Sequence, residues 1–290
     1  MRFLKVHGTG NDFVLIEPKG VEGDWPALSK RLCHRHFGIG ADGLLLVLSS
    51  HVADIRMRMF NPDGSEAEMC GNGIRCITKY AVENGLVPAS ARGLTIETLA
   101  GIKSVKPILS VGKVKEVQVD MGAPLLGPRE IPVDTARLKV EGDPEALSLI
   151  KDYPLTLGRH KLNITCVSMG NPHAVCFMED PVDSFPLADI GPQVEHHPLF
   201  PRRVNFEIVN VLGRGHARVR VWERGVGETM ACGTGACAVA VAGRLKGYLQ
   251  DEVDITLSGG DLKVRWGGKG PVLMTGNAEV VFAGELTDGS

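Results

Sequence analysis

The feature that most constrains the fold is an internal repeat, because the chain aligns with itself at an offset of 162 residues, the spacing between Cys70 and Cys232. One copy reads DIRMRMFNPDGSEAEMCGNGIRC from Asp54, and the other reads HARVRVWERGVGETMACGTGACA from His216. Both copies alternate apolar residues with arginines, which is typical of a half-buried strand, and both continue into Cys-Gly-x-Gly. The sequence therefore predicts two similar halves, and a length of 290 residues is enough for two domains.

Each half is predicted to contain one helix that begins directly after its cysteine. The helices are expected over residues 71–84 and 233–246, and each ends before a glycine suited to a left-handed cap. Cys70 and Cys232 then lie at helix N-termini, where unpaired N–H groups and the helix dipole favour a thiolate. Each cysteine could therefore serve as a nucleophile or a base, and the neighbouring glycines allow a carboxylate to approach the backbone.

The rest of the chain is dominated by strand-like segments, so the expected fold class is α+β. We predict two pseudo-symmetric domains from an internal duplication, each a mainly antiparallel sheet wrapped around a central helix. The boundary is expected in the Gly/Pro-rich residues 122–132. The expected strands cover residues 13–16, 43–48, 94–98, 113–121, 162–169, 174–178, 204–212, 253–257 and 278–282, and a further helix covers residues 25–36.

Composition excludes several classes of partner. The net charge is −2, aromatic residues make up 5% of the chain and no stripe of Lys or Arg is present, so we expect no nucleic-acid partner. The longest apolar segments are far shorter than the roughly 18 residues of a membrane-spanning helix, and the first residues lack the apolar core of a signal peptide. Seven cysteines without the spacing of a disulfide framework are expected to be reduced thiols. We therefore expect a cytoplasmic protein with no membrane partner.

Two thiols related by duplication suggest stereochemical inversion. If the two halves face one another across a pseudo-twofold cleft, one thiol lies on each side of a bound α-carbon. One face can then lose a proton while the other face gains one. A different class of protein also fits Cys70 and Cys232, namely a thiol-redox or binding protein that forms a disulfide between them.

The other cysteines and the histidines carry no such pattern. The gaps Cys70-x5-Cys76 and Cys232-x4-Cys237 do not match the usual spacing of zinc ligands, so we expect no metal site. No Gly-x-Gly segment is followed by the acidic residue of a dinucleotide site. Buried hydrophobic roles are expected for Cys33, Cys76, Cys166, Cys176 and Cys237, and cap or surface roles for His34, His36, His196 and His197.

Four segments, HGTGNDF, NPDGSEAEMCGNGIRC, MGNPHAV and ERGVGETMACGTGACA, resemble the diaminopimelate epimerase family in content and in order. The resemblance implies a cofactor-independent isomerase that interconverts LL- and meso-diaminopimelate, without pyridoxal phosphate, in lysine and peptidoglycan precursor biosynthesis. It also implies that a C-terminal strand returns to the first domain. The expected domains are residues 1–121 with 277–290, carrying Cys70, and residues 122–276, carrying Cys232. The expected partner is the small-molecule substrate, with a homodimer as a candidate assembly.

The resemblance also assigns the functional residues. Cys70 and Cys232 match the two catalytic thiols, and His173 and Glu223 match groups that tune the pKa values of those thiols. The substrate-binding residues that it implies are Asn11, Asn61, Gly71, Asn72, Asn171, Asn205, Glu223, Arg224, Gly233 and Thr234.

A substrate with two ammonium and two carboxylate groups suits this set, since Arg224 can hold a carboxylate through two bonds and Glu223 can accept from an ammonium. Several members also have a simpler interpretation. Glu223 and Arg224 could form a surface pair, Asn61 could shape a turn, and His173 could be a satisfied core histidine. Gly43 stands where some family members carry Gln, so we exclude it from the binding set.

Two other enzymes of the same fold are alternatives, one like proline racemase and one like the phenazine isomerases. Proline offers nothing for Glu223 and Arg224 to hold, and the first motif reads Met-Cys-Gly-Asn rather than the Cys-Gly-His expected of the racemases. Turnover would discriminate the redox class, because an epimerase exchanges a substrate hydrogen with solvent and a redox protein does not.

Overall fold

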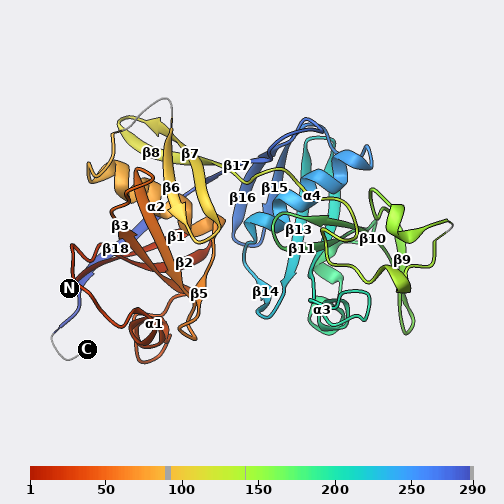
Figure 1. Cartoon of the computed structure of the whole chain (residues 1–290), viewed down its shortest axis with the longest axis horizontal. Helices are drawn as coiled ribbons and strands as arrows, with labels where there is room; N and C mark the ends of the chain where they lie inside the picture. The colour runs from red at the N-terminus through yellow and green to blue at the C-terminus, as the bar shows by residue number, and fades with distance from the viewer. Residues whose placement is uncertain (89–92, 141, 288–290) are drawn as a thin grey trace. The chain divides into compact units, whose positions relative to one another are not determined.

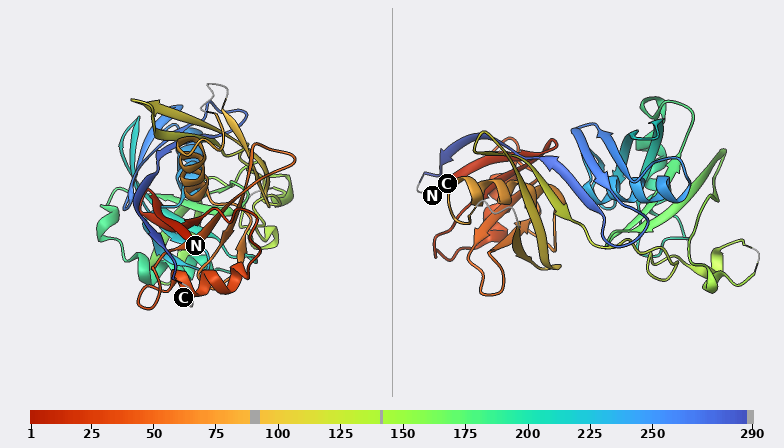
Figure 2. Two further views of the ribbon diagram at one scale, coloured as in Figure 1. Left: turned by 90° about the vertical axis from the view of Figure 1, so that its left-hand side faces the viewer. Right: turned by 90° about the horizontal axis from the view of Figure 1, so that it is seen from above.

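The computed structural model describes residues 1–88, 93–140 and 142–287. The chain divides into two compact units: unit 1 comprises Met1–Asp120 with Thr275–Ser290, and unit 2 comprises Met121–Met274. Of the domains expected from the sequence, residues 89–92, 141 and 288–290 lie outside the described part. The two ends of the described chain lie in unit 1 (Figures 1 and 2). There, Met1 and Leu286 exchange backbone hydrogen bonds.

Unit 1 is a mixed, mainly antiparallel sheet around the helix α2 (Figure 1). Its strands pair in the order β18, β1, β2, β3, β4, β6, β7 and β8, and only β2–β3 and β4–β6 are parallel among the registers described. The buried side chains of α2 include Ile74, Ile77 and Ala81, which pack against this sheet. Its elements are β1 (Arg2–Gly8), β2 (Asn11–Ile16), α1 (Trp25–Cys33), β3 (Gly43–Leu48), β4 (Ile55–Phe60), β5 (Glu66–Ala67), α2 (Gly71–Glu83), β6 (Leu94–Thr98), β7 (Gly101–Ser110), β8 (Lys113–Asp120) and β18 (Glu279–Glu285).

Unit 2 repeats this plan around the helix α4. Its strands pair in the order β9, β10, β11, β12, β13, β15 and β16, and the parallel pairs β11–β12 and β13–β15 occupy the same places as β2–β3 and β4–β6. The strand β17 (Leu273–Asn277) carries the chain back into unit 1. The elements of unit 2 are η1 (Thr135–Arg137), η2 (Pro144–Ala146), β9 (Tyr153–Leu157), β10 (His160–Ser168), β11 (Pro172–Phe177), η3 (Val182–Ser184), α3 (Leu187–Glu195), β12 (Asn205–Gly213), β13 (His216–Glu223), β14 (Gly227–Thr229), α4 (Gly233–Leu245), β15 (Glu252–Leu257) and β16 (Gly260–Arg265).

The common pairing pattern confirms the α+β fold class and the duplication predicted from the repeat. The two helices that follow the cysteines begin where predicted, and Gly85 and Gly247 follow them with φ angles of +72° and +74°. Such backbone conformations suit glycine, which has no Cβ to clash. Within the described residues, no helix is long and apolar enough to cross a membrane.

The helix expected over residues 25–36 is shorter than predicted, because α1 ends at Cys33. It begins as expected, with the Asp24 side chain accepting a hydrogen bond from Ala27 N at 3.0 Å. After Cys33, His34 is extended, and its Nδ1 accepts hydrogen bonds from the backbone N–H groups of His36 and Phe37. The histidine side chain therefore stabilises a turn that replaces the last part of the predicted helix.

The helix α3 is absent from the sequence-based prediction, since it contains the helix-breaking pair Gly191-Pro192. Tertiary contacts stabilise it. A Cβ built on Gly191 would lie 2.5 Å from the Trp222 ring, and Trp222 Nε1 donates a hydrogen bond to Glu195 Oε2 at 2.8 Å. Packing against β13 thus stabilises a helix that the local sequence disfavours.

Candidate active site

Each unit presents one cysteine as the N-cap of its central helix. Cys70 caps α2 and is half-buried, and its Sγ accepts a hydrogen bond from Gly73 N at 3.4 Å. Cys232 caps α4 and is buried, and its Sγ lies 3.4 Å from Thr234 Oγ1. The prediction that these two cysteines lie at helix N-termini is confirmed.

Glycines next to the two cysteines let each helix lie close to its sheet. A Cβ on Gly73 would lie 2.9 Å from Leu45 Cδ2, and a Cβ on Gly235 would lie 2.8 Å from Glu207 Oε1. Gly71 and Gly233 are the first residues of the two helices and are buried. Their backbone N–H groups belong to the helical turn whose donors have no partner within the helix.

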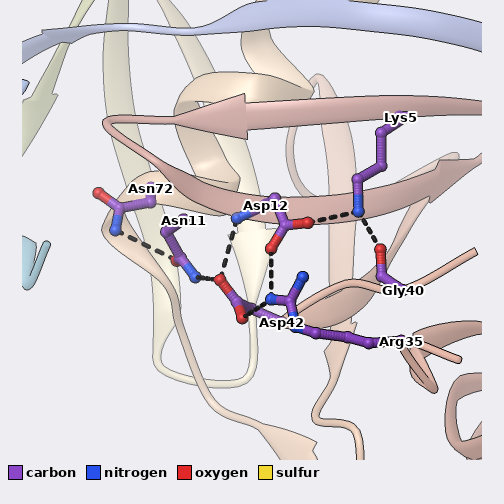
Figure 3. A network of polar contacts seen from close by, with 7 residues as sticks. All are labelled: Lys5, Asn11, Asp12, Arg35, Gly40, Asp42 and Asn72. Carbon is purple, nitrogen blue, oxygen red and sulfur yellow. Dashed lines mark hydrogen bonds and ion pairs between the residues drawn. The ribbon is translucent and has the colours of Figure 1, made fainter. Parts of the chain in front are cut away.

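In unit 1, the amide of Asn11 lies between the helix α2, which Cys70 caps, and an acidic pair formed by Asp12 and Asp42 (Figure 3). Its Nδ2 donates to Asp42 Oδ2 at 2.7 Å, which leaves Oδ1 to accept from Asn72 Nδ2 at 3.2 Å. Cys70 Sγ lies 3.9 Å from the same Oδ1. Because a carboxylate only accepts, Asp42 fixes which end of the Asn11 amide faces the cysteine.

The acidic pair is held by two cations (Figure 3). Arg35 donates to Asp42 at 2.7 Å and to Asp12 at 3.0 Å, and Lys5 also bonds Asp12. Burial alone would raise the pKa of Asp12, but the hydrogen bonds from Lys5 and Arg35 hold it below its ordinary value. The sequence analysis does not predict this network, whose local signal is the polar pair Asn11-Asp12 in an otherwise apolar strand.

Gly43 has no room for a larger side chain. A Cβ there would lie 2.9 Å from the backbone oxygen of Phe60 and 3.1 Å from Met59 Cε. The backbone of β4 therefore fills the space in which a Gln side chain would begin, which is consistent with leaving Gly43 out of the binding set.

In unit 2, Glu223 of β13 and Thr234 of α4 contact the Cys232 thiol, and Thr229 of β14 contacts Glu223. Thr229 Oγ1 donates to Glu223 Oε1 at 2.5 Å, and Glu223 also makes a side-chain hydrogen bond with Cys232. Burial raises the pKa of Glu223 above its ordinary value. Burial, and then the carboxylates of Glu223 and Glu207, raise the pKa of the Cys232 thiol well above its ordinary value. From the sequence, the helix end is expected to favour a thiolate. At Cys232 the hydrogen bonds with Thr234 and Gly235 lower the pKa, but burial and nearby negative charge outweigh them.

Glu207 is the main functional candidate that the sequence reasoning missed. It is fully buried on β12, and its Oε1 lies 2.7 Å from Nδ1 of the fully buried His173. His173 Nε2 lies 3.0 Å from Asn171 Oδ1, and Asn171 Nδ2 donates to Thr234 Oγ1 at 3.2 Å. A continuous series of polar contacts thus links Glu207 to Thr234, in the first turn of the helix that Cys232 caps.

Asn205 lies between β11 and the end of β13. Its Nδ2 donates to the Pro172 carbonyl at 2.8 Å, and its Oδ1 accepts from the backbone N–H of Arg224 at 2.9 Å. The side chain of Arg224 is exposed and donates to the Arg202 carbonyl at 3.1 Å. No ion pair joins Arg224 to Glu223 in the described part of the chain, so the surface-pair interpretation does not hold for these two residues.

Asn61 shapes a turn. Its Nδ2 donates to Ser65 Oγ at 2.9 Å, and backbone hydrogen bonds join Asn61 to Ser65 and Gly64. Its side-chain oxygen keeps the capacity to accept from a ligand.

Arg75 is a second residue that the sequence reasoning missed. It is fully buried in α2, and it donates to Thr9 Oγ1 at 2.7 Å, to the Gly71 carbonyl at 3.0 Å and to the Asn277 carbonyl at 3.0 Å. It therefore ties the turn before β2, the first turn of α2 and the end of β17 together within unit 1.

The remaining cysteines are buried, as expected. Burial raises the pKa of Cys76 and of Cys166 to about 12 and that of Cys176 to about 11. These thiols are poor nucleophiles near neutral pH. Across the described residues, no group of three or more His, Cys, Asp or Glu side chains could hold a metal ion.

Solved structures with the same fold identify the structural class. A phenazine biosynthesis protein from Bacillus anthracis superposes with a TM-score of 0.69 at 19% identity, covering 99% of each chain. A probable proline racemase from Agrobacterium radiobacter superposes with a TM-score of 0.70 at 16% identity, covering 99% of this chain and 93% of the other. The chain therefore shares its fold with these two proteins.

Sequence comparison gives the family. The diaminopimelate epimerase family profile matches residues 3–126 and 165–281. A diaminopimelate epimerase from Moorella thermoacetica is 53% identical over 289 residues, covering 99% of both chains, and one from Pelotomaculum thermopropionicum is 49% identical over 288 residues, covering 98% of both. The chain belongs to the diaminopimelate epimerase family.

Proposed function

We propose that this protein interconverts LL- and meso-diaminopimelate by removing and returning the proton of one α-carbon, in lysine and peptidoglycan precursor biosynthesis. The observation that carries the proposal is a duplicated one: each unit places a cysteine at the N-cap of a glycine-rich helix. The full-length similarity to named diaminopimelate epimerases supports the substrate.

Cys70 and Cys232 are the proposed acid and base, one for each face of the α-carbon. In one direction a thiolate takes the α-proton, and the opposite thiol gives its own proton to the planar carbanion with inversion. The environment of Cys232 supports the protonated, acidic role for this residue before turnover, since burial and two carboxylates raise the pKa of its thiol. Cys70 then acts first as the base, and the roles reverse in the other direction.

The α-carboxylate is the proposed ligand of the two helix N-termini, which supply Gly71 and Asn72 from α2 and Gly233 and Thr234 from α4. Backbone N–H groups at a helix start suit an anion, and they also stabilise the charge that develops when the proton leaves. Asn11 is placed beside them by Asp42 and offers its amide to the same end of the substrate.

The distal amino-acid end is the proposed ligand of Asn61, Asn171, Asn205, Glu223 and Arg224. The exposed guanidinium of Arg224 suits a carboxylate, and Glu223 suits an ammonium. Asn205 also holds the Arg224 backbone, since its Oδ1 accepts a hydrogen bond from the Arg224 N–H at 2.9 Å.

His173 and Glu223 are the proposed tuning groups of the thiols. Glu223 makes a hydrogen bond with Cys232, and His173 lowers the pKa of Glu223 against the effect of burial. Both residues therefore act on the same charged cluster in unit 2.

The reaction in deuterated water tests this proposal. Starting from pure LL-substrate and sampling early, nearly every meso product should carry solvent deuterium at the inverted centre, while unreacted LL-substrate should stay protiated. Early deuterium in the recovered LL isomer would mean that one base removes and returns the proton. Proline, run as a control substrate, should show no exchange, and exchange on proline with none on diaminopimelate would reassign the enzyme.

We infer a cytoplasmic location, which the seven thiols and the absence of a disulfide pattern among them support. A homodimer is also proposed. The strand β18 presents the consecutive apolar residues Val280, Val281 and Phe282, each between 42% and 57% exposed. Sedimentation of the wild-type chain and of Phe282→Lys should give a dimer and a monomer, respectively, and two monomers would contradict the homodimer.

A further inference from the structure

Unit 2 contains a buried ionisable pair at a place where unit 1 contains an apolar pair. In the parallel pairing of β2 with β3, Phe13 lies opposite Gly43, and in the parallel pairing of β11 with β12, His173 lies opposite Asn205. Since Asn205 follows Gly43 by the repeat offset of 162 residues, His173 and Phe13 occupy equivalent positions. Both side chains are fully buried.

The same offset makes Glu207 the equivalent of Leu45. Each is fully buried, and each packs against the corresponding glycine of the following helix, Gly73 for Leu45 and Gly235 for Glu207. Leu45 shows that this position of the fold needs only an apolar side chain. A carboxyl group in that place costs desolvation free energy, so it requires a reason beyond packing.

The contacts of His173 give the hydrogen-bond series a direction. An amide oxygen only accepts, so His173 Nε2 carries the hydrogen shared with Asn171 Oδ1 at 3.0 Å. Asn171 Nδ2 donates in turn to Thr234 Oγ1 at 3.2 Å, which leaves the Thr234 hydroxyl hydrogen available to Cys232 Sγ at 3.4 Å.

At the other end of the series, His173 Nδ1 lies 2.7 Å from Glu207 Oε1. The second oxygen of Glu207, Oε2, is buried and has no hydrogen-bond partner among the described residues. A carboxyl group so placed holds the imidazole in one orientation, as outer partners do for functional histidines.

We propose that Glu207 is a positioning residue for the epimerase reaction: through His173 and Asn171 it orients the Thr234 hydroxyl toward Cys232 and makes the two thiols chemically unequal. This inference rests on the proposed function for its catalytic consequence, but the effect on Cys232 does not depend on turnover. The equivalent positions of unit 1 hold Phe13 and Leu45, whose apolar side chains cannot form such a series.

The titratable groups near Cys232 in unit 2 include side chains from three strands. Glu223 lies on β13, Glu207 on β12 and His173 on β11. The negative charge of Glu207 opposes ionisation of Cys232, whereas the hydrogen bond with Thr234 favours it. Replacing Glu207 with Gln removes the charge and keeps an oxygen that can accept from His173, so the thiolate of Cys232 should form at lower pH.

A difference titration measures this effect. The ultraviolet absorbance of thiolate is followed against pH in two pairs of proteins. The first pair is the wild type and Cys232→Ser, and the second pair is Glu207→Gln and the same variant combined with Cys232→Ser. The difference within each pair reports the ionisation of Cys232. We expect the Glu207→Gln midpoint to lie lower by roughly one unit, or about tenfold more thiolate at a given pH. The same subtraction with Cys70→Ser should show no shift, and Leu45→Met, at the equivalent position of unit 1, should leave Cys232 unchanged. An unmoved Cys232 titration, or equal shifts at both cysteines, would overturn the proposal.

The double variant His173→Phe with Glu207→Leu installs the apolar pair that unit 1 already carries, so it should fold, which far-ultraviolet circular dichroism and thermal melting check. Its kcat should fall roughly 10- to 100-fold while KM changes little, because the Thr234 hydroxyl is no longer oriented. A folded double variant with the wild-type kcat would show that the pair is structural only. If the wild type does not epimerise diaminopimelate, the proposed function fails, and the titration still decides the role of Glu207.

Discussion

Two of the seven cysteines combine a helix N-cap with adjacent glycines, and their surroundings differ in kind. Cys70 Sγ accepts a backbone hydrogen bond from Gly73 and lies near the Asn11 amide oxygen. Cys232 is buried between the Thr234 hydroxyl and two carboxyl groups. Such a difference between the two thiols suits a reaction in which one group acts as the base while the other acts as the acid.

Substitution of the thiols tests their roles residue by residue. Cys70→Ala and Cys232→Ala should each lower the epimerisation rate by roughly 10³-fold or more, because neither thiol can serve both faces of the α-carbon. Cys76→Ala and Cys237→Ala are matched controls, since these residues lie inside the same two helices, and they should keep most of the activity. Near-full activity in either of the first two variants would contradict the two-base assignment.

Arg224 tests the distal end of the substrate. Arg224→Ala should cost roughly 2–5 kcal/mol in kcat/KM for diaminopimelate, because a substrate carboxylate would be left without its cation. Arg218→Ala is the control, since Arg218 makes an exposed ion pair with Asp183, and this variant should change kcat/KM little. Equal, small effects in both variants would remove Arg224 from the binding set.

At the scale of elements, the helix α3 supports the turn that carries Glu223 and Arg224. Glu195, the last residue of α3, accepts hydrogen bonds from Trp222 Nε1 at 2.8 Å and from Gly225 N at 2.9 Å. A helix that contributes no proposed ligand therefore fixes the strand end that contributes two.

Gly191→Ala tests this support. The new Cβ would meet the Trp222 ring at 2.5 Å, so α3 and β13 must separate, and the free energy of unfolding should fall by roughly 1–3 kcal/mol. Gly213→Ala is the control, since no atom lies within 4 Å of a Cβ at that position, and it should leave urea unfolding almost unchanged. A Gly191→Ala protein as stable as the wild type would show that α3 shifts without cost.

Local signals explain which elements could be predicted from the sequence. The helices α2 and α4 carry a cap at each end, and strands such as β3 are short apolar segments, so local pattern and final structure agree. The helix α3 was missed because its Gly191-Pro192 pair disfavours a helix until Trp222 packs against it. Glu207 was missed because an acidic residue in the apolar strand VNFEIVNV gives no local sign of its partner, although the repeat offset to Leu45 contained the signal.

For the whole molecule, the buried thiols predict a loss of stability at alkaline pH. The pKa values of Cys76 and Cys166 rise to about 12 and that of Cys176 to about 11, against an ordinary value of 9.0. Below the ordinary value the thiols are protonated in both states, and above it only the unfolded chain ionises, so stability falls as pH rises from about 9 toward 11. By pH 10 the loss should be roughly 1.4 kcal/mol for each thiol, or about 4 kcal/mol for the three.

Urea unfolding at pH 8 and pH 10 measures this loss, and Cys166→Val separates the thiols from other groups that titrate in the same range. The variant should lose roughly 1.4 kcal/mol less than the wild type between the two pH values. A variant with the same pH dependence as the wild type would exclude ionisation of Cys166 as a cause.

The return of the chain into unit 1 has a consequence for the order of events during synthesis. The strand β1 pairs with β2 on one side and with β18 on the other, and β18 is separated from β1 by the whole of unit 2. Unit 2 is a continuous segment, so all of its residues are synthesised before β18. The strand β1 therefore keeps one open edge until β18 arrives, and a chain cut short after unit 2 would expose that edge to pairing with other chains.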